Sequence, residues 1–397
     1  MTTVSLSKSE PLWTKNFVFV FLSNLFLFLG FQMLIPTLPV YVSQHGGSSS
    51  AIGLVTGIFT FSALLIRPFS GAALDTMDKK TILAMGVILC LSVIGGYHWA
   101  VTVVMVLSLR VIHGLGWGIS TTTYGTIASD LVPVSRRGEG MGYFGMSSTI
   151  AMSLGPIFGI WLMRHYGFAT LFALSALSTL LALLLSQVIS VPTKTETKPS
   201  NQEAGSLVSR LIEKSALFPS FLMLLLGLTY GGIAAFITLF GKEAGIENVG
   251  WFFLFNALLS FLVRPFSGKI FDQKGPFWVL TLGAASCIIG LALLSSASTT
   301  TQLILAAIFY GIGFGSILPS IQAWVINRAI PSRRGAANAT FYSAFDLGIG
   351  GGAIILSIIA GLTNYAHMYR YSILSLVVYL AVYLIYAIKN GSVRMSR

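Results

Sequence analysis

Apolar stretches long enough to cross a membrane recur along almost the whole chain. A spanning helix needs about 20 mostly apolar residues, and twelve stretches meet that length. They are roughly residues 16–42, 51–74, 80–98, 101–128, 139–164, 168–190, 217–240, 248–271, 277–296, 300–325, 336–362 and 369–389. We expect all of them to be helices, because an open sheet edge in lipid leaves backbone groups unpaired. The sequence therefore predicts an all-α membrane protein with twelve spans.

The charge distribution supports this class and gives an orientation. Only 9% of the residues are charged, against roughly 25% in a soluble domain, so a soluble globule is excluded. Of the 24 Lys and Arg residues, 18 fall on the side that both termini share and three on the opposite side. Because basic residues mark the cytoplasmic side, we expect a multi-pass plasma-membrane protein with both termini in the cytoplasm. The formal charge of +12 is then a topology signal, and we expect no nucleic acid as partner.

An internal repeat divides the chain into two similar halves. The run RPFSG begins at Arg67 and again at Arg264, and the same offset of 197 residues aligns the SRRG runs that begin at Ser135 and Ser332. The only long polar segment lies between the halves. We therefore predict a six-helix bundle over residues 1–190, a central cytoplasmic loop over 191–215 and a second bundle over 216–397. Parallel halves around a midplane site are typical of secondary transporters.

Three short motifs carry a resemblance to a known family. GAALDTMDKK, from Gly71 to Lys80, is similar to the inner signature loop of the major facilitator superfamily, and a copy begins at Gly268. RVIHGLGWG from Arg110 resembles the arginine motif of its fourth span, and GPIFG from Gly155 resembles the antiporter motif of its drug:proton branch. The resemblance covers the whole chain.

The resemblance implies a fold and a function. The fold is the major facilitator fold, with two pseudo-symmetric six-helix bundles. The function is export of a small organic solute or drug by alternating access, driven by proton antiport, in a monomer without a cofactor. A dedicated exporter of an opine-type metallophore resembling staphylopine, or of a sugar, is the alternative. A membrane-embedded enzyme is disfavoured because no catalytic or metal-ligand cluster is visible, and a channel is disfavoured by the duplicated bundles with signature loops. No nucleotide-binding run is visible, so we expect the energy to come from an ion gradient or from the gradient of the solute.

The signature loops supply a candidate conformational latch. The resemblance places Asp75 and Asp272 against the cytoplasmic ends of spans eleven and five, where a carboxylate is stabilised at a helix N-terminus. The other interpretation is that these are solvated loop charges that follow the topology rule. The predicted latch comprises Gly71, Asp75, Lys79, Lys80, Gly268 and Asp272. Arg67 and Arg264 fall near inner span ends, where snorkelling to the interface is one interpretation.

Periodic polar and aromatic residues supply candidate substrate contacts. The resemblance assigns spans one, four, seven and ten to the cavity lining, and residues on one face of the first and fourth spans recur every three or four positions. Simple packing is the competing interpretation. The candidates are Asn24, Phe28, Gln32, Arg110, His113, Trp117, Thr121, Tyr124, Tyr310, Phe314 and Tyr342.

Acidic residues inside the membrane are candidate proton carriers, because burial can bring a carboxyl group to titrate near physiological pH. Asp346 is the one acidic residue that falls well inside a span. A structural acid paired with an arginine or a hydroxyl is the alternative. His113 is the second candidate, and Glu139, at the start of span five, is the third.

The motif Gly155, Pro156 and Gly159 has two interpretations. A mid-helix proline kinks a span, which the resemblance links to limiting leakage during exchange. Glycines also let helices approach closely, so packing explains the motif nearly as well.

Overall fold

The structure is a computed structural model that describes residues 11–47, 49–190, 211–246 and 248–389. Within these ranges the regular elements are α-helices and single 3-10 turns, without a strand. The first half contains α1 (Lys15–Leu34), α2 (Leu38–Gln44), α3 (Ser49–Thr76), α4 (Lys79–Gly96), α5 (Val103–Leu131) and α6 (Arg137–Val188). The second half contains α8 (Leu217–Glu243), α9 (Gly250–Lys274), α10 (Pro276–Ser295), α11 (Thr300–Arg328), α12 (Arg334–Leu362) and α13 (Tyr365–Lys389). Most of the central loop, residues 191–210, lies outside the described ranges.

Helix α6 contains two of the predicted spans. Its 52 residues run without an assigned break, but Gly167 has φ 77° and ψ −179°, which is not helical. Both ends lie beside the start of α1: the rings of Trp13 and Tyr143 are 5.0 Å apart, and Asn16 donates to the carbonyl of Ser190. The chain therefore reverses at Gly167, where glycine alone adopts this φ at little cost. With α1 and α2 as one interrupted crossing, the described helices make twelve crossings, as predicted.

Polar N-cap residues mark the starts of equivalent helices in the two halves. Thr102 accepts a hydrogen bond from the amide of Met105 at the start of α5, and Thr299, its counterpart 197 residues later, accepts one from Gln302 at the start of α11. Such N-caps satisfy one of the free amides of the first turn. The repeat between the two halves thus includes the N-cap residues of equivalent helices.

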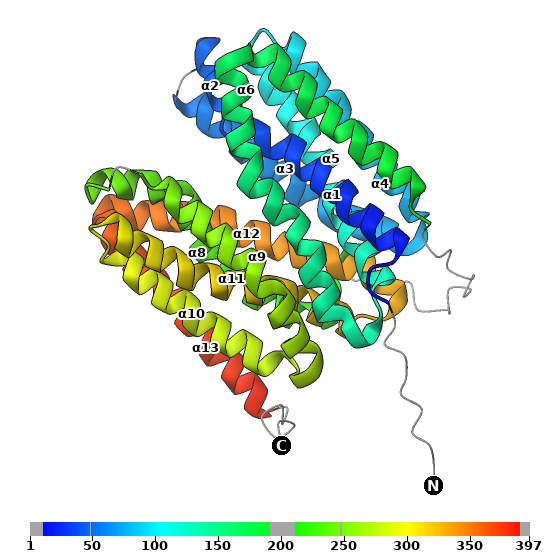
Figure 1. The fold of residues 1–397 in the computed structure, drawn as a ribbon, viewed down its shortest axis with the longest axis vertical. Coiled ribbons are helices and arrows are strands. Elements are labelled where there is room, and N and C mark those ends of the chain that lie inside the picture. Colours follow the sequence, from blue (N-terminus) through cyan, green and yellow to red (C-terminus); the bar gives the residue numbers. More distant parts are fainter. Residues whose placement is uncertain (1–10, 48, 191–210, 247, 390–397) are drawn as a thin grey trace.

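The two halves form separate bundles that meet mainly through matching helices. Figure 1 shows them touching near the termini and diverging at the far end. Across the interface α3 packs on α12, and α6 packs on α9. These pairs are equivalent in the repeat, because α9 and α12 are the later copies of α3 and of the first half of α6.

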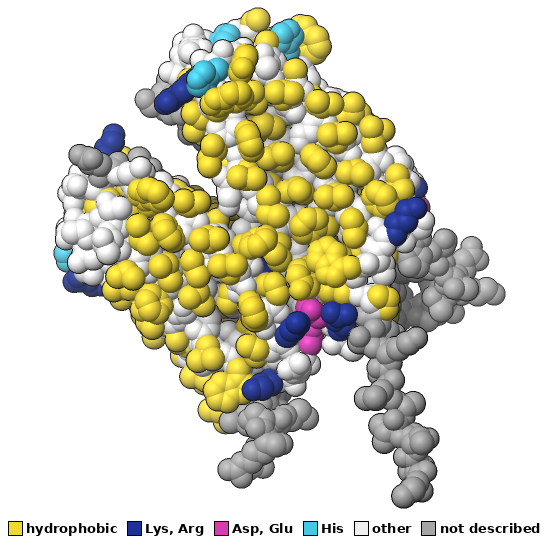
Figure 2. Space-filling model, in the orientation of Figure 1, with side chains coloured by type: hydrophobic (Ala, Val, Ile, Leu, Met, Phe, Trp, Pro, Cys, Tyr) yellow, Lys and Arg dark blue, Asp and Glu magenta, His cyan; other side chains and the backbone are white. Residues whose placement is uncertain are grey.

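The outer surface suits a bilayer, and the far end is open. Figure 2 shows apolar side chains over the visible face of both bundles and a deep notch between them, at the end away from the termini. Eleven continuous helical segments of the described chain are long and apolar enough to cross a membrane, and α6 contributes two crossings. The bundles are thus closed on the terminus side and open on the other.

Candidate functional site

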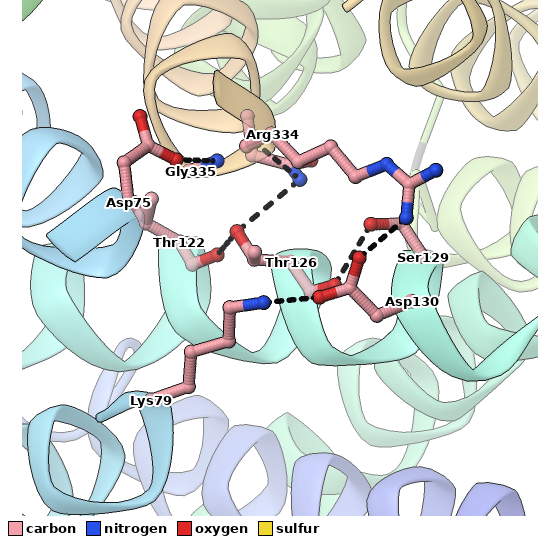
Figure 3. A network of polar contacts seen from close by, with 9 residues as sticks. Asp75, Lys79, Thr122, Thr126, Ser129, Asp130, Arg334 and Gly335 are labelled. Carbon is pink, nitrogen blue, oxygen red and sulfur yellow. Dashed lines mark hydrogen bonds and ion pairs between the residues drawn. The ribbon is translucent and has the colours of Figure 1, made fainter. Parts of the chain in front are cut away.

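Asp75 forms the first contact that closes the terminus side. Its Oδ1 accepts a hydrogen bond from the amide of Gly335 at 2.8 Å, and its Oδ2 accepts one from Ala336 at 3.2 Å, in the first turn of α12 (Figure 3). A Cβ on Gly71 would lie 2.4 Å from the Cβ of Ala339, so only glycine lets α3 approach this closely. The carboxylate of one bundle therefore caps a helix of the other.

Asp272 forms the matching contact in the second half. Its two oxygens accept hydrogen bonds from the amides of Gly138 at 2.7 Å and Glu139 at 2.9 Å. A Cβ on Gly268 would lie 2.5 Å from the carbonyl oxygen of Gly138. We call the contact of Asp75 with α12 the first latch and the contact of Asp272 with α6 the second latch. The two latches are copies of one arrangement.

An ionic network around Asp130 braces the first latch. Asp130, near the end of α5, binds Lys79 through Oδ2 and accepts from Nη1 of Arg334 at 2.6 Å through Oδ1, as Figure 3 shows. Lys79, which was predicted to belong to the latch, pairs with Asp130 of its own bundle. Lys80, predicted with it, instead donates to the carbonyl of Gln187 at 2.5 Å, inside the first bundle.

A neutral residue stands in place of Asp130 at the second latch. There Nη1 of Arg137 donates to Oδ1 of Asn327 at 2.6 Å, and Asn327 is the repeat counterpart of Asp130. Pro276 occupies the position of Lys79. The position of Asp130 is therefore charged at the first latch and neutral at the second.

Glu139, the third proton-carrier candidate, lies at the rim of the second latch. Nη2 of Arg136 is 2.8 Å from its Oε2, and Nζ of Lys269 is 3.9 Å from its Oε1. Two cations thus hold this carboxylate on the terminus side.

The end of the central loop is tethered beside the first latch. Nε of Arg333 donates to Oε2 of Glu213 at 3.0 Å, and the backbone amide of Glu213 donates to Oγ1 of Thr340 at 3.1 Å. Partial burial opposes the charge on Glu213, but hydrogen bonds from Ser215 and the nearby Arg333 outweigh it and lower the pKa of this carboxyl group. The carboxylate form is therefore the one that holds the loop to α12.

Deeper in the interface, Arg67 and Asp346 form an ion pair between the bundles. Nε of Arg67 lies 2.7 Å from Oδ2 of Asp346, and the two side chains are 3% and 15% exposed. Nη1 of Arg67 donates to Thr121 at 2.8 Å, and its guanidinium lies 5.0 Å from the ring centre of Tyr342. Arg67 lies eight residues before Asp75, about 12 Å along α3. Snorkelling is therefore the wrong interpretation for Arg67, which points into the protein.

Arg264, the repeat counterpart of Arg67, is equally buried but differently surrounded. Its side chain is 4% exposed, and neither Nε nor Nη1 has a hydrogen-bond partner among the described residues. A Cβ on Gly145 would lie 2.5 Å from its Nη1. Snorkelling is wrong here too, because the guanidinium lies against a helix of the opposite bundle.

Aromatic rings fill the first bundle beside the predicted cavity residues. Trp117 lies 4.1 Å from Phe31 and 4.6 Å from Phe28, between ring centres. Phe31 also stacks on Phe59 at 4.7 Å. Phe28 and Trp117 were predicted, but Phe31 and Phe59 were missed; the three-residue step from Phe28 to Phe31 was the available signal.

The second bundle has a matching aromatic group. Phe314 stacks on Tyr230 at 4.8 Å and lies 6.2 Å from Phe345. Phe314 was predicted from the repeat, whereas Tyr230 and Phe345 were missed.

Arg110 and His113 are enclosed within the first bundle. The Arg110 guanidinium is 5.0 Å from the ring centre of Phe59, and Nδ1 of His113 is 3.3 Å from the hydroxyl of Tyr97. Both side chains are buried. In this conformation they face aromatic neighbours of their own bundle rather than the partner bundle.

Four further candidates are engaged inside their bundles. Asn24 donates to Oγ of Ser147 at 2.7 Å, and Gln32 packs against Gly155. The other two are fully buried tyrosines, Tyr124 and Tyr310, whose hydroxyls bond Ser23 at 2.5 Å and Thr229 at 2.8 Å. In this conformation the two tyrosines join helices of one bundle, and they offer no free group to a solute.

The antiporter-like motif lies where α6 packs on α1. A Cβ on Gly155 would lie 2.5 Å from Cβ of Gln32, and one on Gly159 would lie 2.3 Å from the carbonyl oxygen of Met33. Pro156 lies within the helix between them. Close helix packing is therefore one role of the motif in this conformation.

Replacing Gly159 by alanine should destabilise the protein. The added methyl group would collide with backbone rather than with a flexible side chain, so α1 and α6 must separate, at a cost of about 1–3 kcal/mol. Thermal denaturation of the purified protein measures this. Gly350→Ala is the matched control, because a Cβ there meets nothing within 4 Å, and alanine is the better helix former. Equal loss in both variants would contradict the packing role.

Comparisons with known proteins agree with this architecture. The Major Facilitator Superfamily profile matches residues 20–353 and 249–391. The chain belongs to the major facilitator superfamily. Among its relatives, an uncharacterised transporter of this type from Methanocaldococcus jannaschii is 26% identical over 380 residues, covering 93% of this chain and 98% of the relative. The quinolone resistance protein NorA of Staphylococcus aureus is 28% identical over 344 residues, covering 82% and 86%.

Solved structures of this superfamily share the fold. The human organic anion transporter MFSD10 matches with a TM-score of 0.76 at 15% identity, covering 92% of this chain and 98% of that one. A bacterial homologue of the iron transporter ferroportin matches with a TM-score of 0.73 at 15% identity, covering 94% and 100%. The protein is thus a multi-pass membrane transporter, and it has the major facilitator fold that its sequence predicts.

Proposed function

We propose that this protein exports a small organic solute across the plasma membrane by alternating access, in exchange for protons. Asp346 carries the proton. The observation that carries the proposal is the 2.7 Å ion pair between Arg67 and Asp346, because it joins the two bundles at a residue that can bind a proton.

Protonation of Asp346 would release this contact. A neutral carboxyl group keeps at most a hydrogen bond to the guanidinium, so the bundles lose the attraction between buried opposite charges. The ion pair and the two latches all join α3 or α9 to the opposite bundle. Proton binding at Asp346 would thus favour opening of the side that the latches close.

The orientation rests on the distribution of basic residues. The latched side is the side of the termini, and 18 of the 24 basic residues belong to it, so we assign it to the cytoplasm. The notch of Figure 2 then faces outward. Protons enter from that side and reach Asp346, and the solute leaves through it.

The aromatic groups favour a solute with apolar surface. Phe28 and Trp117 in one bundle and Phe314 in the other come from helices that the family resemblance assigns to the cavity. Flat rings accept varied apolar shapes, and the relative NorA is named for quinolone resistance. An amphipathic drug-like compound is the substrate class that these features support.

The test is gradient-driven uptake of a fluorescent quinolone into inverted membrane vesicles. With an acidic interior, wild type should accumulate the compound, and Asp346→Asn should lose at least about tenfold of that rate, as is typical when an essential proton-transfer group is removed. Exchange of labelled for unlabelled compound without a gradient should survive, because it needs no net proton movement.

Asp78→Asn is the matched control. Asp78 caps α4 by accepting from the amide and the hydroxyl of Thr81, within its own bundle, and asparagine is an equally good cap. Full proton-driven uptake by Asp346→Asn would rule out Asp346 as the proton carrier. Uptake by wild type that ignores the pH gradient would rule out proton antiport.

A further inference from the structure

The repeat places two buried arginines at equivalent positions in the bundle interface, and only one of them is neutralised. Arg67 binds the carboxylate of Asp346 and donates to the hydroxyls of Thr121 at 2.8 Å and Thr122 at 3.4 Å. Each partner holds a lone pair toward the guanidinium. The charge and the hydrogen-bonding capacity of Arg67 are therefore met within the protein.

Every one of these partners is missing at the counterpart of Arg67. Counting 197 residues back from Asp346 gives Thr149, and counting 197 forward from Thr121 and Thr122 gives Leu318 and Pro319. Leucine and proline side chains offer no acceptor. The Thr149 hydroxyl donates to the carbonyl of Gly145 and carries no charge. The environment that satisfies Arg67 was therefore not duplicated around Arg264.

The repeat also lacks an aromatic residue at the counterpart of Tyr342. Arg67 lies over the ring of Tyr342, whereas the counterpart of Tyr342 is Gly145. Nη1 of Arg264 lies directly over Gly145, so that even a methyl group there would be only 2.5 Å away. A glycine at this position leaves the guanidinium in contact with bare backbone.

Among the residues that the structure describes, Arg264 is consequently a buried cation without a counter-ion. It is 4% exposed, its Nε and Nη1 are unpartnered, and it forms no ion pair with any described residue. A buried charge is costly unless it is paired and hydrogen-bonded, and a guanidinium matches a carboxylate particularly well. The surroundings of Arg264 therefore lack one singly charged group that accepts hydrogen bonds from its guanidinium.

The position of Arg264 indicates where that acceptor would come from. Arg264 lies in α9 and Gly145 in α6, two helices of opposite bundles that separate when the latched side opens. The Asp272 latch is eight residues further along α9, about 12 Å, so opening this side would expose the guanidinium to the same compartment as the latches.

We propose that Arg264 binds a carboxylate group of the transported solute, in the place that Asp346 occupies beside Arg67. The direction of transport in this proposal rests on the proposed export function. The solute carboxylate enters from the latched side, pairs with Arg264, and supplies the missing counter-ion when that side closes. Binding of an acidic solute and closure of the latched side therefore favour each other.

The test compares acids with their neutral amides on the purified full chain. A panel of aryl-alkanoic acids of increasing length, such as 4-phenylbutyrate with 4-phenylbutyramide as its counterpart, is added at fixed pH and ionic strength, and thermal stability is measured. A ligand that binds the folded state raises the melting temperature. We expect wild type to be stabilised by at least one acid and not by the matching amide.

Thr149→Asp should abolish this response while the protein stays folded. The new carboxylate would pair with Arg264 as Asp346 does with Arg67, so the variant should melt above wild type without ligand and should lose the acid-specific rise. Thr149→Asn, which is the same size and neutral, should keep the response. Arg264→Gln should lose it.

Three results would overturn the proposal. One is the absence of an acid-specific rise across the panel in wild type. Another is an unchanged rise in Thr149→Asp or Arg264→Gln. The third is an equal rise with inorganic phosphate at the same ionic strength, which would indicate a general anion effect. Because no gradient is applied, failure here leaves proton-driven export standing, and failure of the vesicle assay leaves this binding result standing.

Discussion

Replacing Arg67 by methionine is expected to lower the free energy of unfolding by about 3–5 kcal/mol, the cost typical of removing one partner from a buried ion pair. The variant leaves the carboxylate of Asp346 at the bundle interface without its cation. It also frees the hydroxyl of Thr121, which accepts from Arg67. Thermal or denaturant unfolding of the purified protein measures the loss.

The double variant Arg67→Met/Asp346→Leu separates the pair from its surroundings. Because it removes both charges, it should recover most of the stability, as replacement of buried pairs by apolar residues often does. It should still lack proton-driven transport. Stability that falls further in the double variant would mean that the two side chains act independently.

Lys269→Met is the matched control for the single variant. Lys269 also reaches across the interface, to Glu139 at 3.9 Å, but its side chain is 57% exposed. Exposed pairs contribute about 0–1 kcal/mol, so this variant should remain near wild type. A loss as large as that of Arg67→Met would show that burial does not decide the effect.

Removing either latch aspartate should open the latched side. Each carboxylate accepts two backbone hydrogen bonds, and bonds to charged groups contribute about 1.5–3 kcal/mol each. Asp75→Ala or Asp272→Ala should therefore shift the ratio of closed to open molecules by roughly 100-fold or more, since 1.4 kcal/mol corresponds to a factor of ten.

Spin labels on the two bundles can measure this shift. Met77 and Ile330 are exposed and lie at the latched ends of α3 and of the chain entering α12, and both native cysteines are buried. Cysteines at these two positions should report a longer distance in either aspartate variant than in wild type. Unchanged distance distributions would contradict a latch.

Asp130→Asn is the control for the charge of the brace alone. Asparagine already occupies the equivalent position at Asn327, where it accepts from Arg137, so the substitution should be tolerated. It removes two ion pairs and leaves the carboxylate caps intact. We expect a smaller opening than with Asp75→Ala.

The structure explains why some functional residues could be predicted and others could not. The latch contacts were expected because the family resemblance places the two aspartates of the duplicated loops against helix starts of the opposite bundle. Asp346 was found by elimination of the other acids, but its partner Arg67 is 279 residues away in the chain and was assigned to a span end. One predicted helix face carries Trp117, Thr121 and Tyr124, yet their partners differ. Trp117 packs on aromatic rings, Thr121 accepts from an arginine of another helix, and Tyr124 bonds a serine.

The sequence by itself determined the number of crossings, the duplication and the side on which the basic residues gather. Length, apolar composition and exact repeats are properties of the chain, and the bilayer permits few structures that fit them. Only the tertiary structure decided which buried charges are paired. In a membrane protein the lipid-facing and core-facing sides of a helix are both apolar, so periodicity does not fix the rotation of a helix against its neighbours. That rotation brings Arg67 to Asp346 and leaves Arg264 over Gly145, although both arginines begin the same run, RPFSG.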